Sequence, residues 1–316
     1  MHLKPSFLHE FYFQTVNNSV LGRRVNMKRL GNSYAIIAIL MWGALALLAK
    51  EASEVPSFLL LAMCFFIAAL IMPLLSVVRG KKSVEKLHFN WGARLIGVSC
   101  LLGFHACYFI ALNHAPVMEV SLIGYLWPMI LALLVAREGR RLQSFVGGCI
   151  GLIAVSVVLG WDNLDFGSQY IIGYMLALSC AVIWAFYSWY LSNNQSSSTE
   201  MSWQCLGVAM GALVISMMTE SWIFELSWSV ILAIVLLGLG PVGGAFYLWD
   251  AGLKRGDKSF ISSLSFSTPL LSAIFLSLFG YVVWSSSLVW SIALLIVAAV
   301  IINFKTNDVQ ISSVAK

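Results

Sequence analysis

Long apolar stretches, separated by short polar turns, run through the chain from about residue 34 to residue 304. A hydrocarbon core about 30 Å thick requires about 20 apolar residues for each helical crossing. Stretches close to this length lie at about residues 34–50, 56–78, 92–112, 117–136, 142–160, 170–191, 202–219, 228–252, 259–279 and 284–304. The pattern therefore predicts an all-α integral membrane protein with ten transmembrane helices.

The apolar pattern occurs twice. Trp42 in the first half corresponds to Trp184 in the second, 142 residues later, and Pro128 corresponds to Pro269, 141 residues later. Each copy holds five predicted crossings, and an odd number means that the second copy enters the bilayer from the opposite side. Inverted repeats of this kind are typical of secondary transporters.

The repeat divides the chain into four parts. Residues 27–160 are predicted to form the first five-helix repeat and residues 161–304 the second, followed by a short cytoplasmic tail at 305–316. Residues 1–26 precede the basic sequence that leads into the first crossing, and we expect this extension to be dispensable or disordered. It is either an amphipathic cytoplasmic tail or the product of an upstream start codon, and we favour the second interpretation.

Composition and charge agree with a membrane protein. Hydrophobic residues make up 60% of the 316 residues and charged residues 10%, whereas soluble domains have about 25% charged residues. With a cytoplasmic amino terminus, 18 of the 19 lysines and arginines fall on the cytoplasmic side, and only Lys50 lies across the membrane. The positive-inside rule then places both termini in the cytoplasm. The net charge of +5 matches anionic lipid headgroups, and no nucleic-acid partner is expected.

The sequence lacks the motifs of several enzyme classes. It contains no phosphate-binding loop of the GxxxxGK[ST] type, and its six cysteines have no CxxC spacing. His9 and Glu10 begin a pattern like HExxH, but Phe13 occupies the position of the second histidine. We therefore expect no catalytic residues, no metal site and no cofactor.

Glu119 is the most distinctive polar residue within a predicted crossing. It lies near the outer end of the fourth crossing, eight residues before Trp127, so a continuous helix would place the two about 80° apart. Two roles remain open for Glu119. It is either a cavity carboxylate that binds a substrate ammonium or a proton, or an acid that stabilises a helix amino terminus.

Two further polar positions lie inside crossings. His105 and Tyr108 are three residues apart in the third crossing, and a histidine at this depth is expected to face the bundle interior. Asp250 lies near the inner end of the eighth crossing, four residues before Lys254. This spacing favours an ion pair between them over a substrate site at Asp250.

The deeper aromatic residues are candidates for a substrate path. Trp42 and Trp184 occupy equivalent positions in the two repeats, Tyr187 lies one turn beyond Trp184, and Trp127 lies deep in the fourth crossing. Aromatic side chains also gather at membrane interfaces, but these positions are away from the predicted helix ends. We expect them to line a central chamber.

Helix-breaking residues occur at corresponding places. Pro128 and Pro269 each remove a backbone hydrogen bond and are expected to kink the fourth and ninth crossings. The eighth crossing carries a stronger interruption, formed by Gly240, Pro241, Gly243 and Gly244. These six residues are hinge candidates, although small residues also allow close helix packing.

Three segments carry a resemblance to a known family. They are GYLWP ending at Pro128, WAFYS at 184–188 and GPVGGAFYLWDAGLKRGD at 240–257. Together with the duplicated five-helix pattern, they resemble the drug/metabolite transporter (DMT) superfamily with tandem EamA domains, most closely its YddG-type aromatic amino acid exporters. The resemblance implies a basket-like cavity, alternating access and a substrate path lined by the stretches that contain His105, Tyr108, Tyr125, Trp127 and Trp184.

The sequence and the resemblance together give a functional hypothesis. We expect a transporter of the bacterial inner membrane that exports aromatic or other hydrophobic amino acids and related metabolites. The alternatives are a broad-specificity drug or metabolite permease and, more remotely, an intramembrane enzyme. The expected partners are a small-molecule substrate and the lipid bilayer, with a monomer as the working assumption for the oligomeric state.

Overall fold

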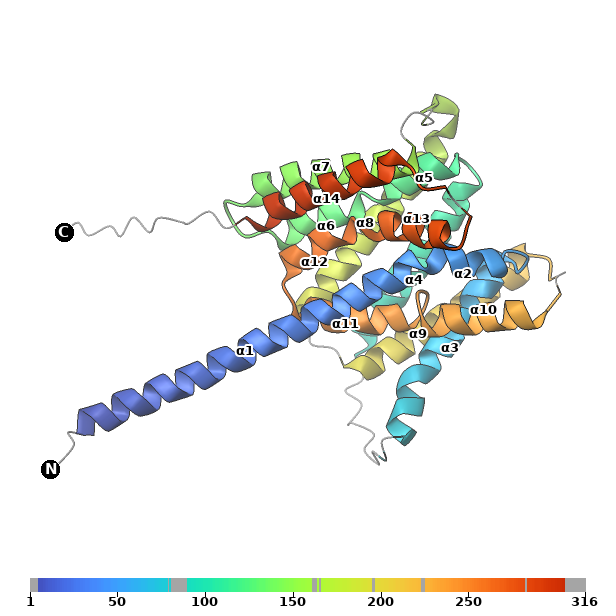
Figure 1. Ribbon diagram of the computed structural model, residues 1–316. Coiled ribbons are helices and arrows are strands. Elements are labelled where there is room, and N and C mark those ends of the chain that lie inside the picture. The colour runs from blue at the N-terminus through green and yellow to red at the C-terminus, as the bar shows by residue number, and fades with distance from the viewer. Residues whose placement is uncertain are drawn as a thin grey trace.

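The computed structural model describes residues 5–78, 80, 90–160, 164, 166–194, 197–222, 225–281 and 283–304, with side chains from residue 22 onward except at 24 and 198. Every regular element within these ranges is helical. The helices are α1 (Pro5–Gly43), α2 (Leu45–Glu51), α3 (Ser57–Val78), α4 (Trp91–Leu112), α5 (Val117–Gly124), α6 (Trp127–Val135), α7 (Arg141–Leu159), the 3-10 turn η2 (Ser168–Tyr170), α8 (Ile171–Asn193), α9 (Ser198–Thr219), α10 (Trp228–Leu239), α11 (Gly244–Arg255), α12 (Lys258–Ser265), α13 (Thr268–Leu278) and α14 (Ser286–Asn303). Figure 1 shows them as one bundle.

These helices combine into the predicted number of crossings. Within the described residues, nine helical segments are long and apolar enough to span a membrane, and the bent pair α12 and α13 makes a tenth. α14 ends at the same end of the bundle from which α1 enters it (Figure 1). The all-α fold with ten crossings is therefore confirmed.

The repeat offset reappears in the helix boundaries. α3 and α9 begin and end 141 residues apart, and so do α5 and α12. α6 and α13 also begin 141 residues apart, at Trp127 and Thr268. One spacing thus governs the middle of both repeats.

Helix packing follows a two-fold arrangement. The most extensive contacts join α3 with α9, α7 with α14, α1 with α11, and α4 with α8. The first two contacts pair equivalent crossings of the two repeats. The last two are related to each other, because α1 corresponds to α8 and α4 corresponds to α11. The core is therefore formed between the repeats more than within either one.

The fourth and ninth crossings are each built from two helices. α5 ends at Gly124 and α6 begins at Trp127, with Pro128 in its first turn; Pro269 lies in the first turn of α13 in the same way. α12 and α13 are bent by 46°. Because the helix is interrupted between Glu119 and Trp127, the continuous-helix angle expected between these two side chains does not apply.

The first crossing differs from its prediction. The stretch expected as one helix at 34–50 is divided between α1 and α2 around Gly43 and Ala44. The helix also begins well before residue 34, because a helix can continue beyond the apolar segment that spans the membrane. Residues 5–26 are thus helical in backbone, which does not test whether the extension at 1–26 is dispensable, and the predicted tail at 305–316 lies outside the described residues.

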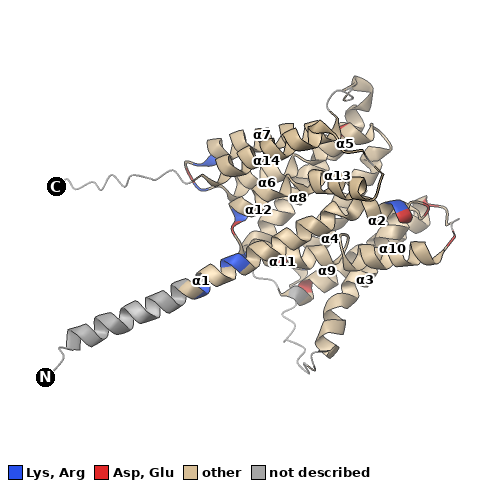
Figure 2. Ribbon diagram, in the orientation of Figure 1, with Lys and Arg blue, Asp and Glu red and all other residues tan. Residues whose placement is uncertain are grey.

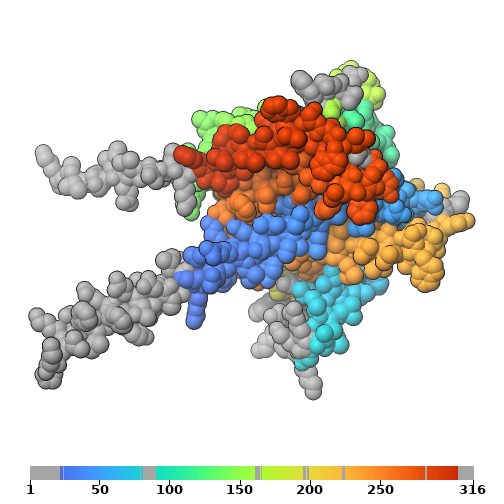
Figure 3. Space-filling view, in the orientation of Figure 1, coloured from blue at the N-terminus to red at the C-terminus, as the bar shows by residue number. Residues whose placement is uncertain are grey.

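The surface has the character of a lipid-exposed protein. Apolar side chains such as Val78, Met218 and Val283 are more than three-quarters exposed. Figure 2 shows charged residues near the two ends of the bundle and few between them. On the face seen in Figure 3, α1 lies between α13 and α14 on one side and α3 and α10 on the other. Such a surface is stable in hydrocarbon, with charges left for the two interfaces.

Candidate functional site

Aromatic rings from both repeats meet at the centre of the bundle. Trp42 of α1 lies 5.7 Å from Trp184 of α8 and 5.0 Å from Trp249 of α11, measured between ring centroids. Trp127 of α6 lies 6.1 Å from Trp184, and Phe246 of α11 lies 5.5 Å from it. We call these five residues the aromatic cluster. Most of its contacts are edge-to-face, the arrangement that aromatic quadrupoles favour.

The repeat explains why these rings converge. Trp42 and Trp184 are equivalent positions, and their rings touch each other. His105 and Phe246 are equivalent at the 141-residue spacing, and their rings lie 6.3 Å apart. Equivalent residues can meet only near the axis that relates the repeats. The cluster therefore marks that axis.

His105 faces this interior with a defined tautomer. Its Nδ1 lies 2.7 Å from the carbonyl oxygen of Leu101, and because a carbonyl only accepts, we assign the proton to Nδ1. The ring packs at 5.4 Å against Phe65 and at 4.9 Å against Phe104. The Nε2 atom is then left as an acceptor among aromatic rings.

The hinge candidates of the eighth crossing adjoin the cluster. Trp42 Nε1 donates a 3.1 Å hydrogen bond to the carbonyl of Pro241, which lies in the break between α10 and α11. Glycine is required just after Pro241. A Cβ on Gly243 would overlap the carbonyl oxygen of Gly238, and a Cβ on Gly244 would overlap that of Leu239. A cluster residue of the first repeat is thus bonded directly to the broken helix of the second.

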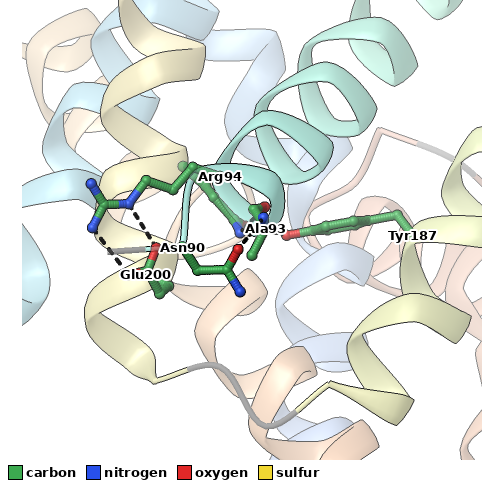
Figure 4. Close-up of polar contacts among 6 residues, drawn as sticks. Asn90, Ala93, Arg94, Tyr187 and Glu200 are labelled. Atoms are coloured by element: carbon green, nitrogen blue, oxygen red, sulfur yellow. Dashed lines mark hydrogen bonds and ion pairs between the residues drawn. The ribbon is translucent and has the colours of Figure 1, made fainter. Parts of the chain in front are cut away.

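Tyr187 is buried next to the aromatic cluster and is hydrogen-bonded to Gln204. Its ring lies 5.9 Å from that of Trp184. Its hydroxyl donates a 2.6 Å hydrogen bond to Oε1 of Gln204, whose Nε2 donates at 3.1 Å to the carbonyl of Ala93. Figure 4 shows Tyr187 reaching from α8 toward the start of α4.

The other predicted residues lie outside the aromatic cluster. Glu119 is 2% exposed, in the first turn of α5. Tyr108 packs against the apolar group that contains Ala111 and Val120. Tyr125, between α5 and α6, packs against a different apolar group that contains Phe266. The structure therefore brings Trp42, Trp127, Trp184 and His105 together, with Tyr187 beneath them.

Sequence reasoning missed two members of the cluster, Phe246 and Trp249. The repeat could have found them, because at the 141-residue spacing they are equivalent to His105 and Tyr108. Trp249 is fully buried, and its Nε1 donates a 3.0 Å hydrogen bond to Ser188. The candidates His105 and Tyr108 in the first repeat could thus have pointed to Phe246 and Trp249 in the second.

Asp250 forms the ion pair that its spacing predicts. Its Oδ2 lies 2.7 Å from Nζ of Lys254, one turn further along α11, and both side chains are largely buried. Within the described part of the chain, no three histidine, cysteine or acidic side chains converge as metal ligands would. The arrangement as a whole is suited to binding an apolar solute. Together with the inverted repeats and broken helices, it defines a multi-pass membrane transporter.

Comparison with known proteins identifies the family. The model of the EamA-like transporter family matches residues 29–160 and 171–304. The chain belongs to this family and contains two copies of its domain. One solved crystal structure aligns with a TM-score of 0.80 and 34% sequence identity, covering 86% of this chain and 96% of that one.

Some relatives of this chain have names that state a function. An Ancylobacter novellus protein named aromatic amino acid exporter YddG is 36% identical over 272 residues, which cover 84% of this chain and 93% of the relative. The Escherichia coli protein of the same name is 24% identical over 204 residues, covering 58% and 67%. A Bacillus subtilis relative, 25% identical over 281 residues and covering 85% and 90%, is named only as the uncharacterized transporter YvbV. Similarity thus extends over nearly the whole length of two of these proteins.

Proposed function

We propose that this protein exports aromatic or other hydrophobic amino acids across the bacterial inner membrane by alternating access, with both termini in the cytoplasm. The observation that carries the proposal is the aromatic cluster, in which Trp42, Trp127, Trp184, Phe246 and Trp249 meet near the axis between the repeats. The names of the YddG relatives support the same substrate class.

The chemistry of the cluster matches such a substrate. In this structure the rings pack on one another, so an aromatic side chain that enters replaces ring–ring contacts with contacts of the same kind. Each aromatic pair contributes about 0.5–1.5 kcal/mol beyond burial of its area. A smaller polar side chain would leave these contacts unreplaced.

Polar groups near the rings suit the charged end of an amino acid. The Nε2 atom of His105 offers an acceptor to the substrate ammonium. The break between α10 and α11 places two helix ends of opposite polarity near the cluster, and in transporters broken helices of this kind bind charged groups of the substrate.

A flux screen in proteoliposomes tests this function. The purified protein is reconstituted, and uptake of each of the twenty amino acids is measured with and without a proton gradient. We expect tryptophan, phenylalanine, tyrosine and leucine to move faster than alanine or aspartate. Transport of unrelated drugs at equal rates would favour a broad permease, and chemical conversion of the solute would favour an enzyme.

A further inference from the structure

A buried ion pair joins the two repeats. Arg94 of α4 donates to Glu200 of α9 through two hydrogen bonds, Nε to Oε2 at 2.8 Å and Nη2 to Oε1 at 3.0 Å. The two residues are 8% and 7% exposed. The guanidinium also lies 5.0 Å from the ring centroid of Trp203. Such a bidentate contact is strong in one geometry and is lost when either helix shifts.

Gln204 and Tyr187 lie between this ion pair and the aromatic cluster and contact residues of both regions. Gln204 lies one turn after Glu200 on α9 and donates to the carbonyl of Ala93, next to Arg94. The same amide side chain accepts from the hydroxyl of Tyr187, whose ring packs against Trp184. Figure 4 shows how these contacts bring α4, α8 and α9 together. We call Arg94, Glu200, Gln204 and Tyr187 the junction.

The junction lies at one end of the bundle. It lies where α4 and α9 begin and α8 ends, the end that the basic residues assign to the cytoplasm. All four junction side chains are buried. Further along α4, His105 and Tyr108 keep part of their surface exposed. The junction side chains are therefore more tightly enclosed than the interior-facing His105 and Tyr108 in the opposite half of α4.

Close packing makes the junction an all-or-none contact. A Cβ on Gly97 of α4 would overlap the side chain of Gln204, and a Cβ on Gly207 of α9 would overlap Val98. The helices are thus in near-contact at two points beside the ion pair. Separating them would break the hydrogen bonds together and admit water to both charged groups. Packed interfaces of this kind switch between discrete states.

We propose that the junction is the cytoplasmic gate of the transport path, and that Gln204 is the positioning residue that links the gate to the substrate site through Tyr187. The proposal rests on the proposed transport function. A substrate that displaces Trp184 would shift Tyr187, weaken its bond to Gln204 and so loosen the contact between α4 and α9. If the ion pair were purely structural, its two hydrogen bonds would stay intact throughout the transport cycle.

Labelling of Cys205 tests the gate without a known substrate. Cys205 follows Gln204 on α9 and is fully buried; the other five cysteines are replaced by alanine. A membrane-impermeant maleimide is applied to each side of oriented membrane vesicles. We expect Arg94→Gln and Glu200→Gln to increase labelling at least about fivefold from the cytoplasmic side alone, and the exchanged pair Arg94→Glu with Glu200→Arg to reverse most of it. Unchanged labelling, or an equal rise from both sides, would overturn the gate.

The matched control is Lys28→Gln. Lys28 pairs with Asp257 at 2.6 Å, also between the repeats and at the same end, but its side chain is 55% exposed. We expect no increase in Cys205 labelling for this variant. An increase equal to that of Glu200→Gln would show that any lost ion pair has this effect, and would overturn the specific role of the junction.

Reversible crosslinking supplies a second test that does not depend on the stability of the single variants. Arg94→Cys and Glu200→Cys are combined in a background free of other cysteines, and the two thiols are joined by a bifunctional methanethiosulfonate. We expect amino acid flux to fall at least tenfold and to recover on reduction, whereas either single cysteine is unaffected by the reagent. Continued flux in the crosslinked protein would refute the gate while leaving the proposed function in place. Absence of flux for every amino acid in the unaltered protein, together with the expected response of Cys205 labelling in the labelling variants, would refute the function and keep the gate.

Discussion

Tryptophan residues of this chain occupy two different environments. Trp184 is 4% exposed and touches other rings of the aromatic cluster, whereas Trp228 begins α10 and is 85% exposed. The exposed position is that of an interfacial anchor, where the indole meets lipid headgroups. Only the buried position can contact a solute inside the bundle. This contrast supplies matched variants.

We predict that Trp184→Ala weakens transport of tryptophan and phenylalanine by tenfold or more, and transport of alanine much less. Loss of a buried aromatic contact costs about 1–3 kcal/mol of binding energy, and only a large substrate makes that contact. Trp127→Ala should behave in the same way, and Trp228→Ala should transport normally. Competition for radiolabelled phenylalanine measures the effect. An equal loss for all substrates would indicate misfolding.

Glu119 supplies the second prediction at this scale. The carboxylate is buried in the first turn of α5, where a charge stabilises the helix by up to about 1 kcal/mol. Gln preserves the shape but cannot titrate. We predict that Glu119→Gln changes flux or its dependence on pH while the expression level is retained. Superimposable curves of transport against pH for the two proteins would remove Glu119 from the substrate path.

At the scale of elements, the breaks in the helices are the distinctive feature. The third and eighth crossings are equivalent, yet α4 is continuous whereas α10 and α11 are separated. Gly103 and Gly244 occupy equivalent positions at the 141-residue spacing. A Cβ on Gly103 would make only an ordinary contact, 3.8 Å from Cδ1 of Ile183, whereas one on Gly244 would overlap the carbonyl oxygen of Leu239. The same residue type thus has different roles in the two repeats.

We predict that Gly244→Ala lowers the thermal stability or abolishes transport, because the overlap is with backbone that cannot rotate away. Gly103→Ala should be neutral or stabilising by up to about 1 kcal/mol, since alanine is favoured over glycine inside a helix. Thermal unfolding in detergent and flux in proteoliposomes measure both effects. Equal behaviour of the two variants would contradict a special backbone at the break.

Asp257 stabilises the start of α12. Its Oδ1 accepts hydrogen bonds from the backbone N–H groups of Ser259 and Phe260, and its Oδ2 pairs with Lys28. Partial burial tends to raise the pKa of this carboxyl, but Lys28 and the two N–H groups outweigh burial and hold the pKa below its usual value. The stabilisation is therefore present above the ordinary aspartate pKa.

We predict that this contribution is lost as the pH falls through the pKa of Asp257, which lies below the usual aspartate value. At neutral pH, Asp257→Ala should lower the stability by about 0.5–2 kcal/mol, the usual cost of removing a helix N-cap. Thermal unfolding of both proteins at neutral and acidic pH is the measurement. The difference between them should shrink in acid, and a difference independent of pH would exclude the carboxylate as its source.

For the whole molecule, the two-fold relation between the repeats organises both packing and charge. The equivalent pairs α3 with α9 and α7 with α14 pack together, so each repeat completes the core of the other. An even number of crossings returns the chain to the side on which it started. The basic residues then determine which side that is.

We predict that both termini are cytoplasmic. Fusion of alkaline phosphatase after residue 304 should be inactive, and fusion of green fluorescent protein at the same point should be fluorescent. The same two fusions after Ala52, which follows Lys50 and the end of α2 on the predicted far side of the membrane, provide the internal control and should give the opposite signals. A periplasmic signal from the carboxyl-terminal fusion would contradict the count of ten crossings.

The sequence by itself determined the membrane class, the number of crossings and the repeat. Each of these depends on local composition, because a bilayer selects apolar segments by length and an internal duplication is visible as a fixed spacing. His105, Trp42, Trp127 and Trp184 could be chosen as interior candidates for the same reason, since polar and aromatic groups deep in hydrocarbon require a protein environment.

Tertiary structure alone decided which of these residues meet. The pairing of Arg94 with Glu200 joins positions 106 residues apart, and the bond from Trp42 to Pro241 joins positions 199 apart. The apolar pattern likewise did not predict that the first crossing is divided at Gly43. Such contacts depend on how whole helices pack across the axis between the repeats, and a hydropathy pattern specifies how deep a residue lies in the membrane without specifying its neighbours.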